Sequence, residues 1–509
     1  MIKRSICLFL VCMLVVCALW GCQNELVEIS QTKPIDVTSE AERMPEDTTM
    51  DENSDSFIIL MEENEPLESL VKSLIAQFGI DHPDLEIELQ ILPGNKKQKE
   101  REITLQRLRV EVMAGKGPDI FLLPTGGYGE NALFPDVNQA MHNGLFEDIS
   151  EYYDADSALD KESLVTGVMD AGVLKDKRYV LPLRYDMPVA YVDVEQFESL
   201  GGNMEIFNDG ILHVFDSVLS SGNKELMLGA YCSNSLVSAL TWNLLGQAVD
   251  YEENAVLLNE KELVRFLESI QLARAAGTVE SDNWENLTTY TSPNNLSMLF
   301  QELEFWSDSV CMYFGSMRDI LDNTAYAKTQ NVEIAMIPMS SVNGEIVADV
   351  TLYGAVGNGC EDVALAYEFL RTLLSEDAQL TMNSDTTSTS DYIGWPVRRS
   401  EDYSHLWNTR KGAVEKFAYT REEWTEEQIS LQQELRKQIL NEYTTNEIEF
   451  SILNTTVDRA EFTISLETEL CIDIIYQLND VFTSAATDVD INSMAVEFVD
   501  ELKWHLAEG

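Results

Sequence analysis

The sequence predicts an α/β protein with more than one domain, and three observations support this prediction. Short apolar runs of strand length alternate with segments whose apolar residues recur at helical spacing. This alternation is typical of parallel sheets whose strands are connected by helices. The chain also has 509 residues, and a chain of this length is usually too long for a single hydrophobic core. Its hydrophobic content of 45% is ordinary for a globular protein.

The first α/β unit begins with the continuous apolar run 57–61. Residues 66–78 then place apolar side chains on one face of a helix, and residues 86–92 alternate apolar and polar residues as a strand does. A charged helix over 97–114 and an apolar strand over 119–123 follow. The order strand, helix, strand, helix, strand predicts a parallel sheet with helical crossovers.

The rest of the chain continues the mixed pattern, without an internal repeat. Further buried strands are predicted at 179–183, 189–192, 310–314 and 332–337. Further helices are predicted at 235–246, 260–276, 361–375, 412–445 and 490–508.

The N-terminus has the pattern of an export signal. Two basic residues precede an apolar stretch over 6–19 that is too short to span a membrane comfortably. Residues 19–22 (Leu-Trp-Gly-Cys) resemble the lipobox of bacterial lipoproteins, in which the cysteine is acylated and becomes the mature N-terminus. We therefore expect a signal peptide over 1–21 and lipid attachment at Cys22, palmitate included. An uncleaved membrane anchor is the alternative. Either way, the bulk of the protein is expected to face outside the cytoplasm at the cell membrane.

An acidic segment follows the signal. Residues 23–56 contain ten acidic residues, two basic residues and no aromatic residue. Such a composition cannot bury enough apolar surface to order the chain, so we predict a flexible tether over 22–56.

The charge balance excludes one class of partner. The chain has 34 Lys and Arg against 88 Asp and Glu, a net charge of −54. Nucleic acid is not an expected partner, because neutralising phosphates needs clustered Lys or Arg. Solubility is the simplest role for such a surface.

The cysteines and histidines suggest neither a metal site nor a cofactor. Beyond the lipobox, Cys232, Cys311, Cys360 and Cys471 are scattered singly, so we expect buried thiols and leave a disulfide among them open. There is no zinc-protease helix motif, no Gly-x-Ser-x-Gly elbow and no phosphate-binding loop. A secreted glycosidase stays open, because its two carboxylates need no sequence signature.

Several segments form an ordered set of motifs. They are the glycine turn and Pro-Asp strand of 112–121, the segments 175–191 and 310–315, the strand and turn of 337–344, the helix of 364–379 and the glycine-proline segment of 394–398. This set, which covers about residues 57–400, resembles the family 1 extracellular solute-binding proteins of ABC importers, whose best-known members bind maltose and other oligosaccharides. The terminal helix 490–508 fits as well, and the resemblance makes 175–191 the first crossing between lobes and 310–315 the return crossing.

This resemblance implies a two-lobe, periplasmic-binding-protein-like fold of type II, in which each lobe is a mixed or parallel sheet flanked by helices. The segments that connect the lobes are expected near 183–188, 313–317 and 353–358. Lobe 1 would then comprise 57–183 plus 316–355, and lobe 2 would comprise 188–313 plus 358–509.

The resemblance also implies a function. We expect a monomeric receptor that captures a small solute, a sugar or oligosaccharide, by hinge closure and passes it to an ABC permease in the membrane, with no reaction and no cofactor. A solute-sensing or surface-polymer-binding lipoprotein of the same fold is one alternative, and the glycosidase is the other.

The candidate ligand-binding residues are those expected near the crossings. Aromatic rings suit the apolar faces of sugars, and carboxylates suit their hydroxyl groups. Core packing is the alternative role for each aromatic residue, and it is favoured for Trp242; Gly315 could instead serve as a hinge glycine. The candidates are Tyr128, Tyr185, Asp186, Trp242, Gly315, Ser316, Tyr353 and Trp395.

Overall fold

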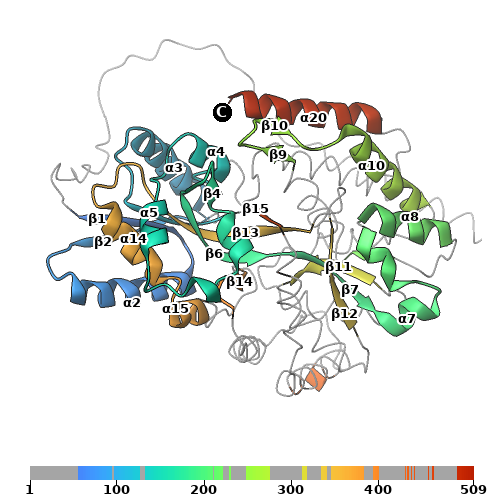
Figure 1. Ribbon diagram of the computed structural model, residues 1–509, viewed down its shortest axis with the longest axis horizontal. Coiled ribbons are helices and arrows are strands. Elements are labelled where there is room, and N and C mark those ends of the chain that lie inside the picture. The colour runs from blue at the N-terminus through green and yellow to red at the C-terminus, as the bar shows by residue number, and fades with distance from the viewer. Residues whose placement is uncertain are drawn as a thin grey trace, which may run out of the picture. The chain divides into compact units, whose positions relative to one another are not determined.

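Figure 1 shows the computed structural model of the chain. Cys22 and the predicted tether up to residue 55 lie outside the described residues, as do the predicted helix 235–246 and most of 412–445. All described residues belong to one compact unit, Asp55–Gly509. They are residues 56–94, 97–125, 132–209, 211–221, 228–230, 248–275, 312–317, 334–340, 346–382, 394–399, 461–463 and 490–508, with single positions between 430 and 457.

The larger of the two main described sheets has seven strands in the order β14-β6-β13-β3-β1-β2, with β15 beside β13. Strands β1, β2 and β3 are parallel to one another, as the sequence predicts, and β13 runs antiparallel to both β3 and β6. The strands are β1 (Phe57–Glu62), β2 (Ile87–Leu92), β3 (Ile120–Pro124), β6 (Val180–Asp186), β13 (Val347–Val356), β14 (Trp395–Pro396) and β15 (Glu461–Thr463).

Helices α2 (Glu65–Asp81) and α3 (Gln98–Met113) are the crossovers between the first three strands. Asn64 begins α2 by accepting a hydrogen bond from the Leu67 backbone N–H (3.0 Å), as N-capping residues do. The buried side chains of α2 lie at helical spacing, so its apolar face covers the sheet. The other elements of this lobe are α4 (Val137–His142), α5 (Ser150–Ala155), η3 (Lys161–Ser163), α6 (Thr166–Asp170), α14 (Val363–Thr372), α15 (Glu376–Thr381) and the hairpin of β4 (Val173–Leu174) and β5 (Lys177–Arg178).

A second, four-stranded sheet has the order β12-β7-β11-β8. Strand β7 (Pro188–Asp193) lies between β12 (Ile334–Pro338) and β11 (Met312–Ser316) and is antiparallel to both, whereas β8 (Leu228–Ala230) is parallel to β11. Helices α7 and α8 lie beside this sheet in Figure 1, and α10 lies against α8 and α20. The remaining bounds are α7 (Val194–Ser199), η4 (Met204–Asp209), α8 (Ile211–Ser221), α10 (Glu260–Ala275), α20 (Ile491–Glu508) and the hairpin of β9 (Val249–Asp250) and β10 (Ala255–Val256).

The buried apolar side chains form two clusters: one surrounds the seven-stranded sheet and also includes Val189 and Tyr191 of β7, and the other includes Ala190 and Val192 of β7 together with the helices of the second sheet. We call the elements around the seven-stranded sheet the first lobe and those around the four-stranded sheet the second lobe. The predicted α/β class, with parallel strands and helical crossovers, is confirmed.

The structure divides the chain between the lobes differently from the predicted boundaries. Strand β12, at 334–338, pairs with β7 and so belongs to the second lobe, whereas 316–355 was assigned to the first. Helices α14 and α15 and strands β14 and β15, assigned to the second lobe with 358–509, belong to the first. A crossing back to the first lobe therefore lies between β12 and β13, upstream of the predicted 353–358.

Close packing of α14 on β13 explains why α14 belongs to the first lobe. A Cβ atom added to Gly354 of β13 would lie 2.6 Å from a methyl carbon of Leu370 on α14. Leu370 and Phe369 are fully buried there. Helix α14 thus contributes its apolar face to the first core, and α15, β14 and β15 belong to the same lobe, whereas α20 belongs to the second, as the predicted boundaries had it.

No helix among the residues that the structure describes has both the length and the apolarity needed to cross a bilayer.

Candidate functional site

The two lobes are joined where β6 becomes β7. Only Met187 separates these strands, so the chain passes from the first sheet to the second within one residue. Strand β11 ends beside this connection, because the Met317 backbone N–H donates to the Met187 carbonyl (2.8 Å) directly after Ser316 pairs with Pro188. Met187 and Met317 are fully buried. The β6–β7 connection at Met187 is a covalent link around which the lobes could rotate.

Two of the candidate aromatic residues lie together next to this crossing. Trp395 of β14 is the antiparallel partner of Tyr185 of β6, and side chains opposite each other on paired strands share one face. Gly394 allows this approach: its φ is +120°, and a Cβ there would lie 2.6 Å from the Tyr185 carbonyl oxygen. Trp395 and Tyr185 are 2% and 5% exposed. The structure therefore places Tyr185 and Trp395 next to each other, and both side chains are buried.

A buried glutamine fixes β6 and β14 beside this aromatic pair. Arg184 donates to the Gln379 side-chain oxygen and to its backbone carbonyl, both at 2.6 Å. The same side-chain oxygen accepts from the Val397 N–H (3.1 Å), and the Gln379 amide donates to the Leu373 carbonyl (2.8 Å). Arg184 and Gln379 are both buried. Gln379 on α15 therefore connects the strand that carries Tyr185 with the segment that carries Trp395.

Two carboxylates oppose each other at the end of β6. Asp186 is paired with Asp349 of β13, and the two residues are 3% and 5% exposed. Asp186 also accepts a hydrogen bond from the Met187 backbone N–H (2.8 Å), so it lies directly at the crossing. Asp349 was not among the predicted residues. Its sequence signal is an acidic residue within the apolar strand that runs to Val356.

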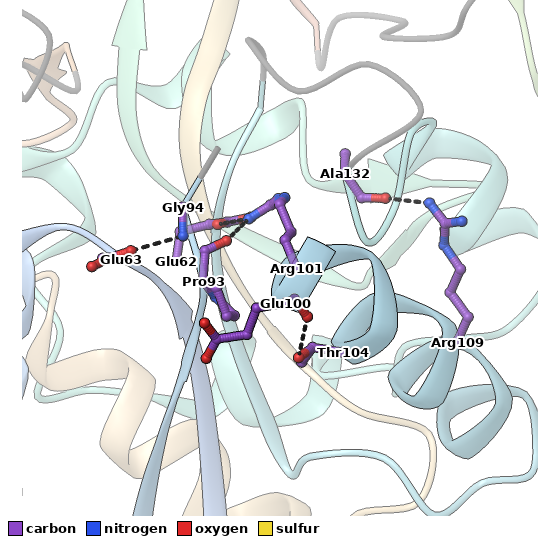
Figure 2. Close-up of polar contacts among 9 residues, drawn as sticks. All are labelled: Glu62, Glu63, Pro93, Gly94, Glu100, Arg101, Thr104, Arg109 and Ala132. Carbon is purple, nitrogen blue, oxygen red and sulfur yellow. Dashed lines mark hydrogen bonds and ion pairs between the residues drawn. The ribbon is translucent and has the colours of Figure 1, made fainter. Parts of the chain in front are cut away.

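The carboxyl end of β1 carries a buried ion pair (Figure 2). The Arg101 guanidinium donates to both Glu62 oxygens (2.6 and 2.7 Å) and to the Pro93 carbonyl (2.6 Å). Glu62 and Arg101 are 4% and 1% exposed. Burial raises the pKa of Glu62, while the hydrogen bonds and positive charge of Arg101 act in the opposite direction.

Glu63, the residue after Glu62, also contacts the loop after β2 and lies nearer the surface. Glu63 accepts from the Gly94 backbone N–H (2.8 Å) and from the Lys97 ammonium group (2.9 Å). The loop after β2 is therefore attached to the end of β1 by both residues, as Figure 2 shows. Ligands of open α/β sheets bind beyond the carboxyl ends of parallel strands, so this edge belongs to the candidate site.

The other candidate residues are placed as follows. Tyr353 is 1% exposed, lies 6.4 Å from Phe146 between ring centroids and belongs to the first core. Burial and the nearby Glu62 charge raise its pKa. Gly315 and Ser316 pair through their backbone with β7, opposite Val189 and Pro188. The structure does not describe the remaining candidates, Tyr128 and Trp242.

The described residues offer no group of three or more His, Cys, Asp or Glu placed to hold a metal ion. Cys360 is buried, and burial, followed by the charge of Asp119, raises the pKa of its thiol to about 12. A thiol held neutral in this way is a poor nucleophile. The other three predicted thiols lie outside the described residues.

No family model matches the sequence, and no curated protein matches it either. Solved structures do match in three dimensions. The sugar-binding protein MalE from Xanthomonas citri is 11% identical with a TM-score of 0.55; the match covers 89% of this chain and 98% of that one. An extracellular solute-binding protein family 1 from Alicyclobacillus acidocaldarius is 13% identical (TM-score 0.53), with 89% and 98% covered.

A third match is a galacto-N-biose-/lacto-N-biose I-binding protein of the ABC transporter from Bifidobacterium longum, in complex with lacto-N-biose. It is 13% identical (TM-score 0.53), with 89% of this chain and 99% of that chain covered. All three are named as binding proteins. At these identities the similarity establishes the fold, and the predicted resemblance to family 1 extracellular solute-binding proteins is confirmed at that level.

Proposed function

We propose that the protein is an extracytoplasmic, lipid-anchored receptor that captures a sugar or oligosaccharide between its lobes and presents it to an ABC importer. The observation that carries this proposal is the connection at Met187, where β6 of the first sheet continues into β7 of the second across one residue, beside the end of β11. A solute that contacts both lobes stabilises the closed arrangement by its difference in affinity for the closed and open forms. No bond has to break for this purpose.

The residues around the crossing suit a sugar. Tyr185 and Trp395 supply paired rings with apolar faces, and Asp186 supplies carboxylate oxygens for hydroxyl groups. All three are covered in the arrangement of this structure, so a sugar would reach them in an arrangement that opens the lobes. Sugar-binding proteins among the structural neighbours support this ligand class. The Leu-Trp-Gly-Cys sequence ending at Cys22 supports the lipid anchor, and the family resemblance supports partnership with a permease.

Titration calorimetry against a panel of oligosaccharides tests the proposal. We expect one class of sugar to bind with a Kd of about 1 μM or below, and Tyr185→Ala or Trp395→Ala to weaken it more than about tenfold, or 1.4 kcal/mol. Tyr152→Ala is the matched control, because Tyr152 is a partly exposed residue on α5. Circular dichroism must show that each variant is folded at the temperature of the titration.

Chromatography of the sugar after prolonged incubation separates binding from catalysis. The proposal predicts that the sugar is recovered intact. Release of smaller sugars would support the glycosidase alternative, and unchanged affinity in both the Tyr185 and Trp395 variants would refute the assigned site.

A further inference from the structure

Asp136 is a buried carboxylate of the first lobe that contacts residues of the second. It is the N-cap of α4, where one side-chain oxygen accepts from the Gln139 backbone N–H (3.0 Å). Its side chain is 2% exposed. The cap uses one carboxylate oxygen and leaves the other to face the second lobe.

Two side chains of the second lobe meet at that other oxygen. The Tyr251 hydroxyl, in the turn between β9 and β10, donates to it, and Nε2 of His505 lies 2.8 Å from it. His505 lies in the last turn of α20, whose Phe498 and Leu502 are buried in the second core. Two elements far apart in sequence therefore converge on one atom of the other lobe.

A neighbouring contact joins the same two surfaces. The Glu252 carboxylate, next to Tyr251, accepts a hydrogen bond from the Lys175 backbone N–H (2.7 Å) in the turn between β4 and β5. Lys175 and Asp176 have positive φ angles of 51° and 61°, which turn this backbone N–H group outward in a tight hairpin. The β9–β10 turn is thus attached to the first lobe at two points.

The surroundings indicate that these contacts can separate. A pocket of about 600 Å³ lies beside them, lined by α3, α4, the segment 133–136 and His505. Glu102 and Arg109 of α3 are among its polar lining residues. Polar groups next to such an open pocket can exchange their partners for water, whereas a close-packed apolar interface would lose its stabilisation on opening.

We propose that the contacts of Asp136 with Tyr251 and His505 form a reversible latch between the lobes. The latch stabilises the arrangement of this structure, and hinge rotation away from it breaks both contacts. The latch is separate from the β6–β7 connection at Met187. It acts on the lobe equilibrium itself, so it holds whether or not the solute is a sugar.

Distances between spin labels on the two lobes test the latch without any solute. Labels are placed through non-natural amino acids at Ile80 on α2 and Leu272 on α10, which are 69% and 60% exposed. In the full chain we expect the combined Tyr251→Phe and His505→Leu variant to broaden the distance distribution about twofold, because the lobes sample additional arrangements. An unchanged distribution would overturn the proposal.

Lys503→Gln is the matched control. It removes an exposed ion pair with Asp500 (2.8 Å) on the same helix, two residues from His505. The latch predicts that this variant keeps the distribution of the unmodified protein, and equal broadening in both would refute it. Should the double variant fail to fold, Asp136→Ser serves, because serine can keep the cap of α4 while removing the oxygen that contacts Tyr251 and His505. A distribution in Asp136→Ser identical to that of the unmodified protein would likewise refute the latch.

Discussion

Arg101→Met is expected to lower the free energy of unfolding by about 3–5 kcal/mol, because it leaves the buried Glu62 carboxylate without its cation. Both partners are almost completely buried, so water cannot replace the lost hydrogen bonds. Chemical denaturation at neutral pH measures the change. The matched control is Arg107→Met on the same helix, which removes an exposed pair with Glu111 and should cost less than about 1 kcal/mol.

The pH dependence of the Arg101→Met defect follows from the pKa of Glu62. Burial raises this pKa above that of the unfolded chain, and removing Arg101 raises it further. The folded state then binds a proton more tightly than the unfolded state does, so protonation relieves the defect. The loss of stability should therefore shrink as the pH falls through the raised pKa. A defect of the same size at acidic and neutral pH, or a control variant equally damaged, would contradict the assignment.

Gln379→Leu is expected to cost about 3 kcal/mol of stability and to weaken solute binding several-fold. The substitution removes the amide that accepts from Arg184 and from Val397 and donates to Leu373, all within the core. Hydrogen bonds to a buried guanidinium are among the strong ones, and their loss leaves donors unsatisfied.

The binding defect has a geometric origin. Gln379 connects β6 to the segment after β14, so without it the pairing of Tyr185 with Trp395 loosens. Thermal denaturation and calorimetry measure the two effects. Gln90→Leu provides the control, because the Gln90 amide donates to Glu88 at the surface of β2. Full affinity in a folded Gln379→Leu protein would show that the hydrogen bonds of Gln379 do not position Tyr185 and Trp395.

Local patterns in the sequence predicted the elements of the first α/β unit well. The runs over 57–61, 86–92 and 119–123 become β1, β2 and β3, and the periodic segments between them become α2 and α3. Each pattern depends on residues close in sequence, whose alternation or helical spacing already identifies the buried face.

Contacts between distant residues were not predictable in this way. Strand β12 pairs with β7 across more than a hundred residues, and nothing local distinguishes it from a strand of the first lobe. The ion pair between Glu62 and Arg101 spans 39 residues, and a charged helix gives no sign that one of its arginines is buried. Gln379 likewise reads as an ordinary polar residue in a short helix.

The candidate site was predicted in part. The resemblance placed Tyr185 and Trp395 near the crossings, and the structure pairs them. Tyr353 lies on the same strand as Asp349, but its ring packs in the first core beside Phe146. Which face a strand residue occupies depends on the register with its neighbours, and β13 has register shifts beside Leu352 that the sequence does not reveal.

Small-angle X-ray scattering of the protein with and without a saturating oligosaccharide tests lobe closure most directly. If the lobes rotate about the β6–β7 connection at Met187 to enclose the sugar, its addition should reduce the radius of gyration, while the sugar is recovered intact. An unchanged scattering profile at saturation by a sugar that calorimetry shows to be bound would contradict capture by hinge closure.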